Sequence, residues 1–262
     1  MGSRQADAQD DGFRNWGATN PDASFGDVGF VAASEVGGDA RTRAWSSAAP
    51  PIDEASVCSR PMTDVVSLAE AAGTDVARVL TDAFLDDPGW RDVGPERELH
   101  RRLVMWGYHR ALQRKALRWG RPGYAAFRDG QLVGVAVTFD HEAWPPPEPI
   151  STLLNVPAFA LAGPFAAMRG WRADTMMKRV HFHDLHVFLW QLAVDPPVQR
   201  SGVGHALMAR VVADADDAEL PVYLETAKPE NVPYYRSFGF VETGCERLPR
   251  GAPLWLMLRP HA

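Results

Sequence analysis

Two glycines separated by one residue lie between an apolar stretch and a helix-like pattern, where they could bind a phosphate group. The apolar stretch covers residues 189–194. The loop that follows contains Gln199, Arg200, Ser201, Gly202, Val203 and Gly204. A strand, a short loop and a helix in this order direct several backbone N–H groups to one place beside the positive end of the helix. Because glycine has no Cβ to keep a ligand from this backbone, residues 199–204, the glycine loop, are predicted to bind phosphate.

A second motif follows the glycine loop and carries an asparagine, two tyrosines and a glycine–phenylalanine pair. It reads Asn231-Val232-Pro233-Tyr234-Tyr235-Arg236-Ser237-Phe238-Gly239-Phe240. In their order and separation the two motifs resemble the GCN5-related N-acetyltransferase (GNAT) superfamily. A tighter resemblance, to the puromycin N-acetyltransferase-like branch of small-molecule acetyltransferases, rests also on residues 83–88, 224–226 and 253–257. The resemblance is clear from about residue 185 to 259, extends back to about residue 64, and does not include the first sixty residues.

This resemblance implies that acetyl-CoA is the cosubstrate. Its pyrophosphate would lie on the amides of the glycine loop, and Arg200 could add a charge-assisted contact. The alternative is an ordinary strand–helix connection that happens to use glycine. Asn231 would bond the pantetheine arm, cap the short helix after it, or do both. The resemblance also implies that the pantetheine arm pairs, like an added strand, with the backbone of Leu192, Ala193 and Val194.

Acetyl transfer from a thioester to an amine needs a proton donor for the leaving thiolate. By resemblance Tyr235 occupies the position of that general acid. A phenol with an ordinary pKa of about 10 can donate a proton to a thiolate held at short distance. The alternative for Tyr235 is a tyrosine that only packs where a helix meets a strand.

The general base is less evident from the sequence. Many members of the superfamily use a glutamate on the fourth strand, where this chain has Trp190 and Gln191. Glu225 is the leading candidate, and its alternative is a structural carboxylate bonded to backbone. A histidine base could come from the cluster His181, His183 and His186. We predict no metal, because the family needs none and no Cys/His ligand pattern is present.

The acceptor is expected to meet side chains at the end of the first helix and on the fourth strand. The residues predicted to bind it are Phe84, Asp86, Asp87 and Trp190. Asp86 and Asp87 would pair with a cationic amine, or would form a solvated helix-ending turn. We therefore expect an N-acetyltransferase for a small primary amine, such as an antibiotic or another xenobiotic. The alternatives are a protein or peptide N-acetyltransferase and a non-catalytic CoA-binding module.

The elements that position these residues follow from apolar periodicity and breakers. We expect a strand at 65–68, a helix from 74 or 75 to about 84, and a break at 86–89. A second helix should cover about 95–117, with Leu99, Leu103, Trp106 and Leu112 facing inward. Further expectations are a hairpin at 124–139 that turns at Asp129-Gly130, helices within 150–180, and strands at 185–194, 221–226 and 255–258.

These elements predict a single α/β domain. The resemblance specifies it as a GNAT fold with a twisted, mostly antiparallel mixed sheet, flanked by helices and splayed between its fourth and fifth strands. The domain should cover residues 62–262. Residues 1–61 lack Leu, Lys and Tyr and contain five basic and nine acidic residues. We expect this segment to be disordered or non-native, with Met62 as the native start.

The composition argues against several other classes of protein. The net charge of −6 argues against general nucleic-acid binding. No apolar run approaches the ~20 residues of a membrane span. The N-terminus has no basic region followed by an apolar stretch, so we expect no secretory signal. Two cysteines cannot form a disulfide framework, which favours a reducing cytoplasm. We expect a cytoplasmic monomer or homodimer whose partner is a small-molecule amine, with no nucleic-acid or membrane partner.

Overall fold

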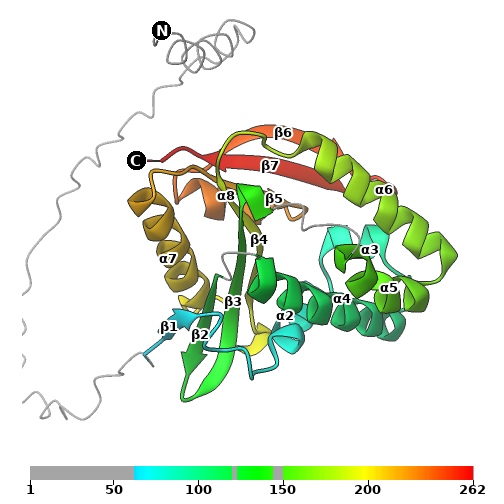
Figure 1. The fold of residues 1–262 in the computed structure, drawn as a ribbon, viewed down its shortest axis with the longest axis horizontal. Coiled ribbons are helices and arrows are strands. Elements are labelled where there is room, and N and C mark those ends of the chain that lie inside the picture. The colour runs from blue at the N-terminus through cyan, green and yellow to red at the C-terminus, as the bar shows by residue number, and fades with distance from the viewer. Residues whose placement is uncertain (1–61, 120–122, 144–149, 262) are drawn as a thin grey trace, which may run out of the picture. The chain divides into compact units, whose positions relative to one another are not determined.

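The computed structural model describes residues 62–119, 123–143 and 150–261, so the predictions for residues 1–61 lie outside it (Figure 1). These residues form a seven-stranded sheet in the order β1-β2-β3-β4-β5-β7-β6. Neighbouring strands are antiparallel except β4 and β5, which are parallel. The strands are β1 (Asp64–Ser67), β2 (Tyr124–Arg128), β3 (Gln131–Asp140), β4 (Val187–Val194), β5 (Val222–Thr226), β6 (Val241–Arg247) and β7 (Pro253–Arg259). The predicted mixed, mostly antiparallel sheet is confirmed.

Helices cover both faces of the sheet. Helix α7 lies on one side of β2–β4, and α2 and α4 lie on the other (Figure 1). The helices are α2 (Val76–Phe84), α3 (Pro88–Val93), α4 (Glu98–Trp119), α5 (Ile150–Ala162), α6 (Pro164–Val180), α7 (Val203–Asp217) and α8 (Asn231–Arg236), with short turns η2 (His141–Ala143) and η3 (Pro196–Val198). Among the described residues, no helix is both long and apolar enough to cross a membrane.

Strand β3 is buried on both faces and joins the two halves of the core. Successive side chains of a strand point to opposite faces. Val135 and Val137 accordingly pack in the cluster that includes α2 and α4, whereas Ala136 packs in the cluster that includes α7. The predicted hairpin before it is confirmed, and both turn residues, Asp129 and Gly130, have positive φ (49° and 71°). This combination is typical of the primed turns that join antiparallel strands.

The sheet opens between β4 and β5, as predicted. These strands pair at only three positions, of which Leu189 opposite Leu224 is the last. Beyond it, β4 continues to Val194 while pairing only with β3. The register of β3 and β4 shifts at Trp190, which has no opposite residue and forms a bulge. The backbone of β4 from Trp190 to Val194 therefore borders a gap, which we call the β4–β5 opening.

The inward face predicted for the long helix is wrong for three of its four residues. Leu99, Leu103 and Trp106 are 71%, 53% and 47% exposed, whereas Leu112 is buried as predicted. Helix α4 instead buries Met105 and His109 on the face that includes Leu112. The helical period was therefore correct but the face was not, because buried His109 stands where an apolar residue would have marked the inward stripe.

A short helix occupies the segment predicted as a break. Asp87 caps α3 by accepting hydrogen bonds from the backbone N–H groups of Gly89 and Trp90. Pro88 stands in the first turn, where its missing N–H costs nothing and its fixed φ suits a helix. The Asp-Asp-Pro-Gly sequence thus ends α2 and also begins α3.

Gly134 on β3 sets how closely α7 approaches the sheet. A Cβ on Gly134 would lie 2.7 Å from Val203 Cγ1 and 2.9 Å from Leu207 Cδ1, both on α7. Because Val203 directly follows Gly202, this contact also limits the distance between the glycine loop and the sheet. Sequence analysis missed Gly134, because the residues that crowd it are about 70 positions away in the chain.

We expect Gly134→Ala to lower the free energy of unfolding by about 1–3 kcal/mol, the usual cost of overpacking a core. Chemical denaturation measures the change. Gly73→Ala is the matched control, since a Cβ there would meet nothing within 4 Å, and surface substitutions usually stay within about 0.5 kcal/mol. Equal stabilities of the two variants would contradict the close approach of α7.

Candidate active site

The glycine loop presents unpaired backbone donors at the start of α7. Gly202 is the N-cap residue, in the left-handed region at φ 93°, and no side chain caps this helix. Arg200 also has positive φ, at 61°. The first N–H groups of an α-helix have no partner within the helix, and its N-terminus carries partial positive charge. With residues 199–202 exposed, this end of α7 can hold an anion such as phosphate.

Side chains fix the shape of the glycine loop. The guanidinium of Arg128, at the end of β2, donates to the Ser201 hydroxyl at 2.8 Å and to the Ser201 carbonyl at 2.9 Å. The Ser201 hydroxyl donates to the Val198 carbonyl. The Gln199 amide reaches back to the Val194 carbonyl at 3.1 Å. Gln199 and Ser201 therefore act on the loop itself, and Arg128 is a contributor that sequence analysis missed.

Gly204 lies where α7, β4 and α8 meet. A Cβ on Gly204 would be 3.4 Å from Val194 Cγ2 and 3.5 Å from the Tyr234 hydroxyl. These are ordinary van der Waals distances, so the protein itself has room for a side-chain methyl group. The requirement for glycine at this position would come from a ligand approaching the helix end.

Tyr235 is buried in α8, with only 7% of its surface exposed. Its ring packs against Tyr234 and Phe240, at centroid distances of 5.3 and 5.8 Å. Burial, aided by nearby Tyr234 and Asp87, raises the pKa of Tyr235 well above its ordinary value of 10.0. The phenol is therefore protonated at neutral pH, which is the form that a general acid needs.

Asn231 connects the start of α8 to the end of β5. Its amide donates to the Thr226 hydroxyl at 3.3 Å. The N-cap of α8 is Glu230, and no side chain supplies a cap bond. The predicted capping role of Asn231 is therefore wrong, because the helix begins at Asn231 itself and its side chain turns toward Thr226 instead.

Glu225 lies on β5, one residue beyond the last pair between β4 and β5. Its carboxylate accepts a hydrogen bond of 2.9 Å from the Tyr223 hydroxyl. Burial raises the pKa of Glu225 to about 7, and the bond from Tyr223 opposes this rise. A carboxylate with a pKa near neutrality holds and releases a proton easily, which suits a general base.

Three polar side chains in a row, from β4, α4 and α2, support the β4 bulge. The side-chain amide of Gln191 lies 3.3 Å from His109 Nε2, and His109 Nδ1 lies 2.9 Å from the Thr81 hydroxyl. Burial lowers the pKa of His109 to about 3, so the ring is neutral. Trp190, the bulged residue, is partly buried and packs edge-on against Phe188 at 5.3 Å. The three polar side chains tie β4 at the opening to α4 and α2.

The residues predicted to bind the acceptor occupy different environments. Asp87 is buried beneath the first turn of α3, and burial raises its pKa, although the charge of Lys228 opposes this rise. Asp86 is exposed and pairs with Arg91. Phe84 is partly buried, with its ring 6.4 Å from that of His109. The structure thus brings Asp87, rather than Asp86, close enough to influence Tyr235.

Asp92 locks three elements together beside this region, a role that sequence analysis missed. Its buried carboxylate accepts hydrogen bonds from the backbone N–H groups of Arg250 and Ala252, in the turn between β6 and β7. From α6, Arg169 donates to the carbonyls of Asp92 and Gly94, at 3.1 and 2.6 Å. Helix α3, helix α6 and the β6–β7 turn are therefore held as one unit.

The histidine cluster is poorly suited to act as the base. His181 and His186 meet through their Nε2 atoms at 3.2 Å, and His186 Nδ1 donates to the Asp184 carbonyl. Burial lowers the pKa of both rings, to about 3 for His181. A lowered pKa makes His181 and His186 weaker proton acceptors than an ordinary histidine. Among the described residues, no group of three or more His, Cys, Asp or Glu side chains could hold a metal ion.

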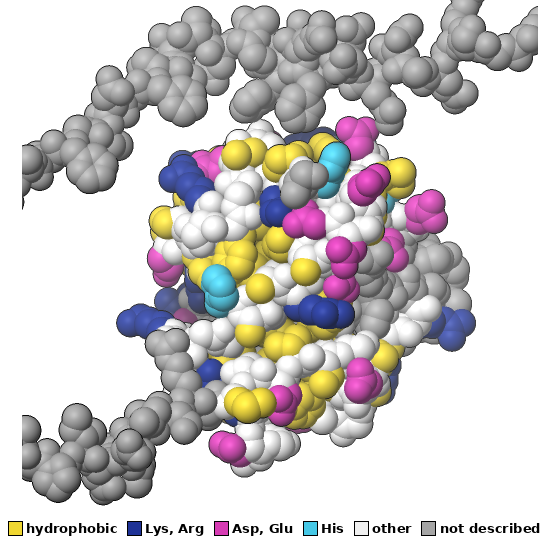
Figure 2. Space-filling view, turned by 90° about the vertical axis from the view of Figure 1, so that its left-hand side faces the viewer, with side chains coloured by type: hydrophobic (Ala, Val, Ile, Leu, Met, Phe, Trp, Pro, Cys, Tyr) yellow, Lys and Arg dark blue, Asp and Glu magenta, His cyan; other side chains and the backbone are white. Residues whose placement is uncertain are grey.

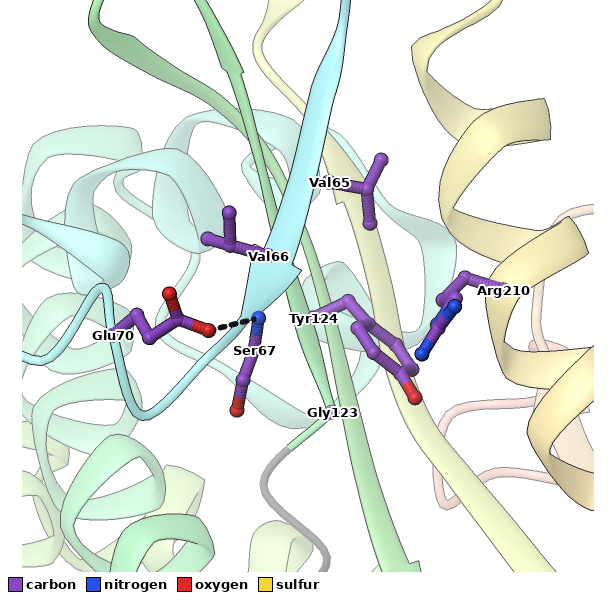
Figure 3. Close-up of a pocket in the computed structure, with 7 residues that line it drawn as sticks. All are labelled: Val65, Val66, Ser67, Glu70, Gly123, Tyr124 and Arg210. Atoms are coloured by element: carbon purple, nitrogen blue, oxygen red, sulfur yellow. Dashed lines mark hydrogen bonds between the residues drawn. The ribbon is translucent and has the colours of Figure 1, made fainter.

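A separate pocket of about 410 Å³ lies beside the edge strand β1. Figure 3 shows its lining side chains around β1, with Tyr124 and Arg210 on the side of α7. Its lining residues are Val65, Val66, Ser67, Glu70, Gly123, Tyr124 and Arg210. None of them belongs to the glycine loop, the β4–β5 opening or α8, so we do not assign this pocket to the candidate active site.

The face of the described domain drawn in Figure 2 carries basic and acidic side chains interspersed with apolar ones. A phosphate backbone is bound by a continuous basic surface. Among the described residues that this view shows, the charges do not form such a surface. The expected absence of a nucleic-acid partner stays a prediction.

Comparison with known proteins identifies the family. The model of the acetyltransferase (GNAT) family matches residues 90–240 of this chain. The chain belongs to this family and is an N-acetyltransferase, and the acyl donor of the family is acetyl-CoA. This confirms the superfamily expected from the two motifs, while the puromycin-like branch stays a prediction.

Two solved structures share the fold. One is described as histone acetyltransferase HPA2 and related acetyltransferase from Corynebacterium glutamicum, at 22% identity and a TM-score of 0.55, covering 77% of this chain and 97% of that one. The other is the C-terminal condensation domain of Ebony in complex with beta-alanyl-dopamine, at 10% identity and a TM-score of 0.53, covering 76% and 99%. At these identities the likeness shows the fold alone.

Proposed function

We propose that this protein transfers the acetyl group of acetyl-CoA to a primary amine of a small molecule. One observation carries the proposal: the β4–β5 opening is bordered by the donor-rich start of α7 and by Glu225, whose pKa lies near neutrality. Helix α8, which carries Tyr235, connects the two, through Asn231 to β5 and through Tyr234 to Gly204. Acetyl transfer to an amine requires an anion site, a base and an acid, and we assign these roles to the start of α7, Glu225 and Tyr235.

The described residues fit acetyl-CoA. The amides of residues 200–204 would hold its pyrophosphate, where the helix end lacks a side-chain cap. Within the part of the chain that the structure describes, the backbone of Leu192, Ala193 and Val194 has no strand partner on the side of the opening, so it could pair with the pantetheine arm. When bound, the thioester supplies an activated acetyl group.

Two side chains would then move protons. Glu225, ionised in about half of the molecules near pH 7, accepts the proton that the amine loses on attack. Tyr235, held protonated by burial, donates a proton to the sulfur of the leaving thiol. These transfers would leave Glu225 protonated and Tyr235 deprotonated, so one proton must return from Glu225 to Tyr235 through solvent before the next turnover. The overall balance is then one proton lost by the amine and one gained by the thiol.

The elements around the proposed acceptor site are held together by hydrogen bonds, which favours a small amine over a protein as the acceptor. Asp92 and Arg169 hold α3, α6 and the β6–β7 turn together beside Asp87. Gly89 of α3 packs so close to the residue after β5 that a Cβ on it would be 3.3 Å from Ala227 Cβ. An acceptor site framed by three cross-linked elements suits a compact ligand better than a folded chain. An antibiotic or another xenobiotic amine is the proposed class.

Thiol release from acetyl-CoA, measured over a panel of small primary amines and of peptides with free N-termini or lysines, tests this function. We expect turnover with at least one class of small amine and none with the peptides. Turnover with peptides alone would favour the protein N-acetyltransferase. Binding of acetyl-CoA without turnover of any acceptor would favour the non-catalytic module and contradict the proposal.

Gly204→Ala is expected to separate ligand binding from stability. The added methyl group meets only ordinary contacts within the protein, and alanine is a better helix residue than glycine by up to about 1 kcal/mol. The melting temperature should therefore hold or rise, while the Kd for acetyl-CoA rises at least about tenfold because the methyl group blocks approach to the helix end. Calorimetry and thermal denaturation give both values. An unchanged Kd would remove Gly204 from the binding site.

A further inference from the structure

Tyr234 has a buried hydroxyl group without a hydrogen-bond partner. Its oxygen is inaccessible to solvent and has no partner among the described residues. Buried polar groups in folded proteins are nearly always hydrogen-bonded, and an exception in a native structure calls for an explanation. The Tyr235 hydroxyl is not among these orphaned atoms, so the feature distinguishes Tyr234 from its neighbour.

Two aromatic contacts hold the Tyr234 ring, and a third holds its neighbour Phe238. The Tyr234 ring packs edge-on against Tyr235 and Phe238, both at a centroid distance of 5.3 Å. Phe238 packs in turn on His205 of α7, at 4.9 Å. The ring is therefore held between α8 and the first turn of α7.

The hydroxyl points to the helix end that carries the glycine loop. It lies 3.5 Å from the position that a Cβ on Gly204 would take. The polar groups of a helix N-terminus are N–H donors, which cannot accept a proton from a phenol. Burial raises the pKa of Tyr234 to about 12, so the hydroxyl is also a donor at neutral pH. Among the described residues, no acceptor is bonded to this hydroxyl, although a phenol can both donate and accept.

We propose that the Tyr234 hydroxyl is a binding group for acetyl-CoA, donating a hydrogen bond to an acceptor oxygen of the bound cosubstrate. This rests on the proposed function. Phosphate and amide oxygens are the acceptors that acetyl-CoA carries, and either would satisfy the hydroxyl together with the amides of α7. Tyr234 and Tyr235 thus divide two tasks between adjacent residues, since the first binds the cosubstrate and the second protonates its sulfur.

Tyr234→Phe in the full chain tests this assignment through two opposite changes. Removing a buried hydroxyl that lacks a partner should stabilise the free protein and raise its melting temperature by about 2–4 °C. Losing a hydrogen bond to the ligand should raise the Kd for acetyl-CoA about five- to tenfold. Calorimetric titration and thermal denaturation without ligand provide the two readouts, and neither depends on turnover.

Tyr124→Phe is the matched control, because Tyr124 lies on β2 beneath Arg210, at the separate pocket. This variant should change neither value. A Tyr234→Phe variant with the Kd of the wild type would overturn the assignment. So would a weaker Kd that comes with a lower melting temperature, since a packing role explains that pair of results. A wild-type protein that binds no acetyl-CoA would contradict the proposed function instead, so the two failures are distinguishable.

Discussion

Replacing Tyr235 by phenylalanine is expected to lower kcat by about 10²- to 10³-fold, the usual contribution of a positioned general acid. The phenol is buried and protonated, and the substitution removes one oxygen from a ring whose packing against Tyr234 and Phe240 is retained. Because the proton moves only as the thiol leaves, the Kd for acetyl-CoA should stay within about twofold of wild type. Thiol release at saturating acceptor and calorimetric titration measure the two quantities.

Tyr234→Phe is the matched control for this experiment. It removes the same oxygen from the preceding residue, and its expected effect is on Kd rather than on kcat. A Tyr235→Phe variant that turns over at the wild-type rate would remove the general-acid role. A large rise in the Kd for acetyl-CoA in this variant, with little change in kcat, would mean that the roles of the two tyrosines are exchanged.

Glu225→Gln should lower kcat by about 10²-fold or more at pH 8. In the wild type, kcat/KM should rise with pH and level off above about 7, because the base works only when Glu225 is ionised. The glutamine variant should lose this rise, since its amide does not titrate. Glutamine can still accept the hydrogen bond from Tyr223, so the surrounding geometry is retained. Initial rates from pH 5 to 9 provide the comparison.

The same substitution should change how stability depends on pH. The pKa of Glu225 is raised from 4.5 to about 7 on folding, so the folded protein keeps a proton that the unfolded chain has already lost between these values. The contribution of Glu225 to stability is therefore greatest below pH 4.5 and is lost as pH rises through 7. Relative to wild type, Glu225→Gln should gain about 2–3 kcal/mol of unfolding free energy between pH 5 and pH 8.

Urea denaturation at the two pH values measures this gain. Glu242→Gln is a useful control, because Glu242 lies on the edge strand β6 and pairs with Arg236 near the surface. It makes the same change from glutamate to glutamine outside the β4–β5 opening. In this account the ionised form of Glu225 is the active base and also the form that destabilises the folded protein. The protein should therefore be less stable in the pH range where it is most active. Identical pH dependence in wild type and Glu225→Gln would contradict the raised pKa.

Much of the fold could be predicted from the sequence, because its signals are local. Asp129-Gly130 predicts a tight hairpin whether or not the rest of the chain is known. The apolar run before the glycine loop and the helical spacing after it likewise predict β4 and α7 from neighbouring residues. The opening between β4 and β5 came from the family resemblance, and the structure confirms it in the three pairs that join these strands.

What the sequence could not predict depends on contacts between distant residues. Gly134 is required by the side chains of Val203 and Leu207, and Arg128 acts on Ser201, 73 positions later. The inward face predicted for α4 is wrong because its buried stripe includes His109, whose ring nitrogens contact Thr81 and Gln191. Such partners become visible only when the chain is folded.

The orphaned hydroxyl of Tyr234 has the same origin. From the sequence, the tyrosine beside the expected general acid would be interpreted as a packing residue. The structure shows that its hydroxyl oxygen is buried beside Gly204, with no hydrogen-bond partner among the described residues. The raised pKa of Glu225 also follows from its surroundings, since burial at the β4–β5 opening is its largest cause.

Amide hydrogen exchange with and without acetyl-CoA tests most directly whether the start of α7 holds the cosubstrate. On adding acetyl-CoA, we predict that exchange slows most at the backbone amides of residues 200–205 and along 192–194, the two segments that border the opening. Slowed exchange confined to residues 64–70, at the separate pocket, or no slowing anywhere at saturating acetyl-CoA, would contradict this account.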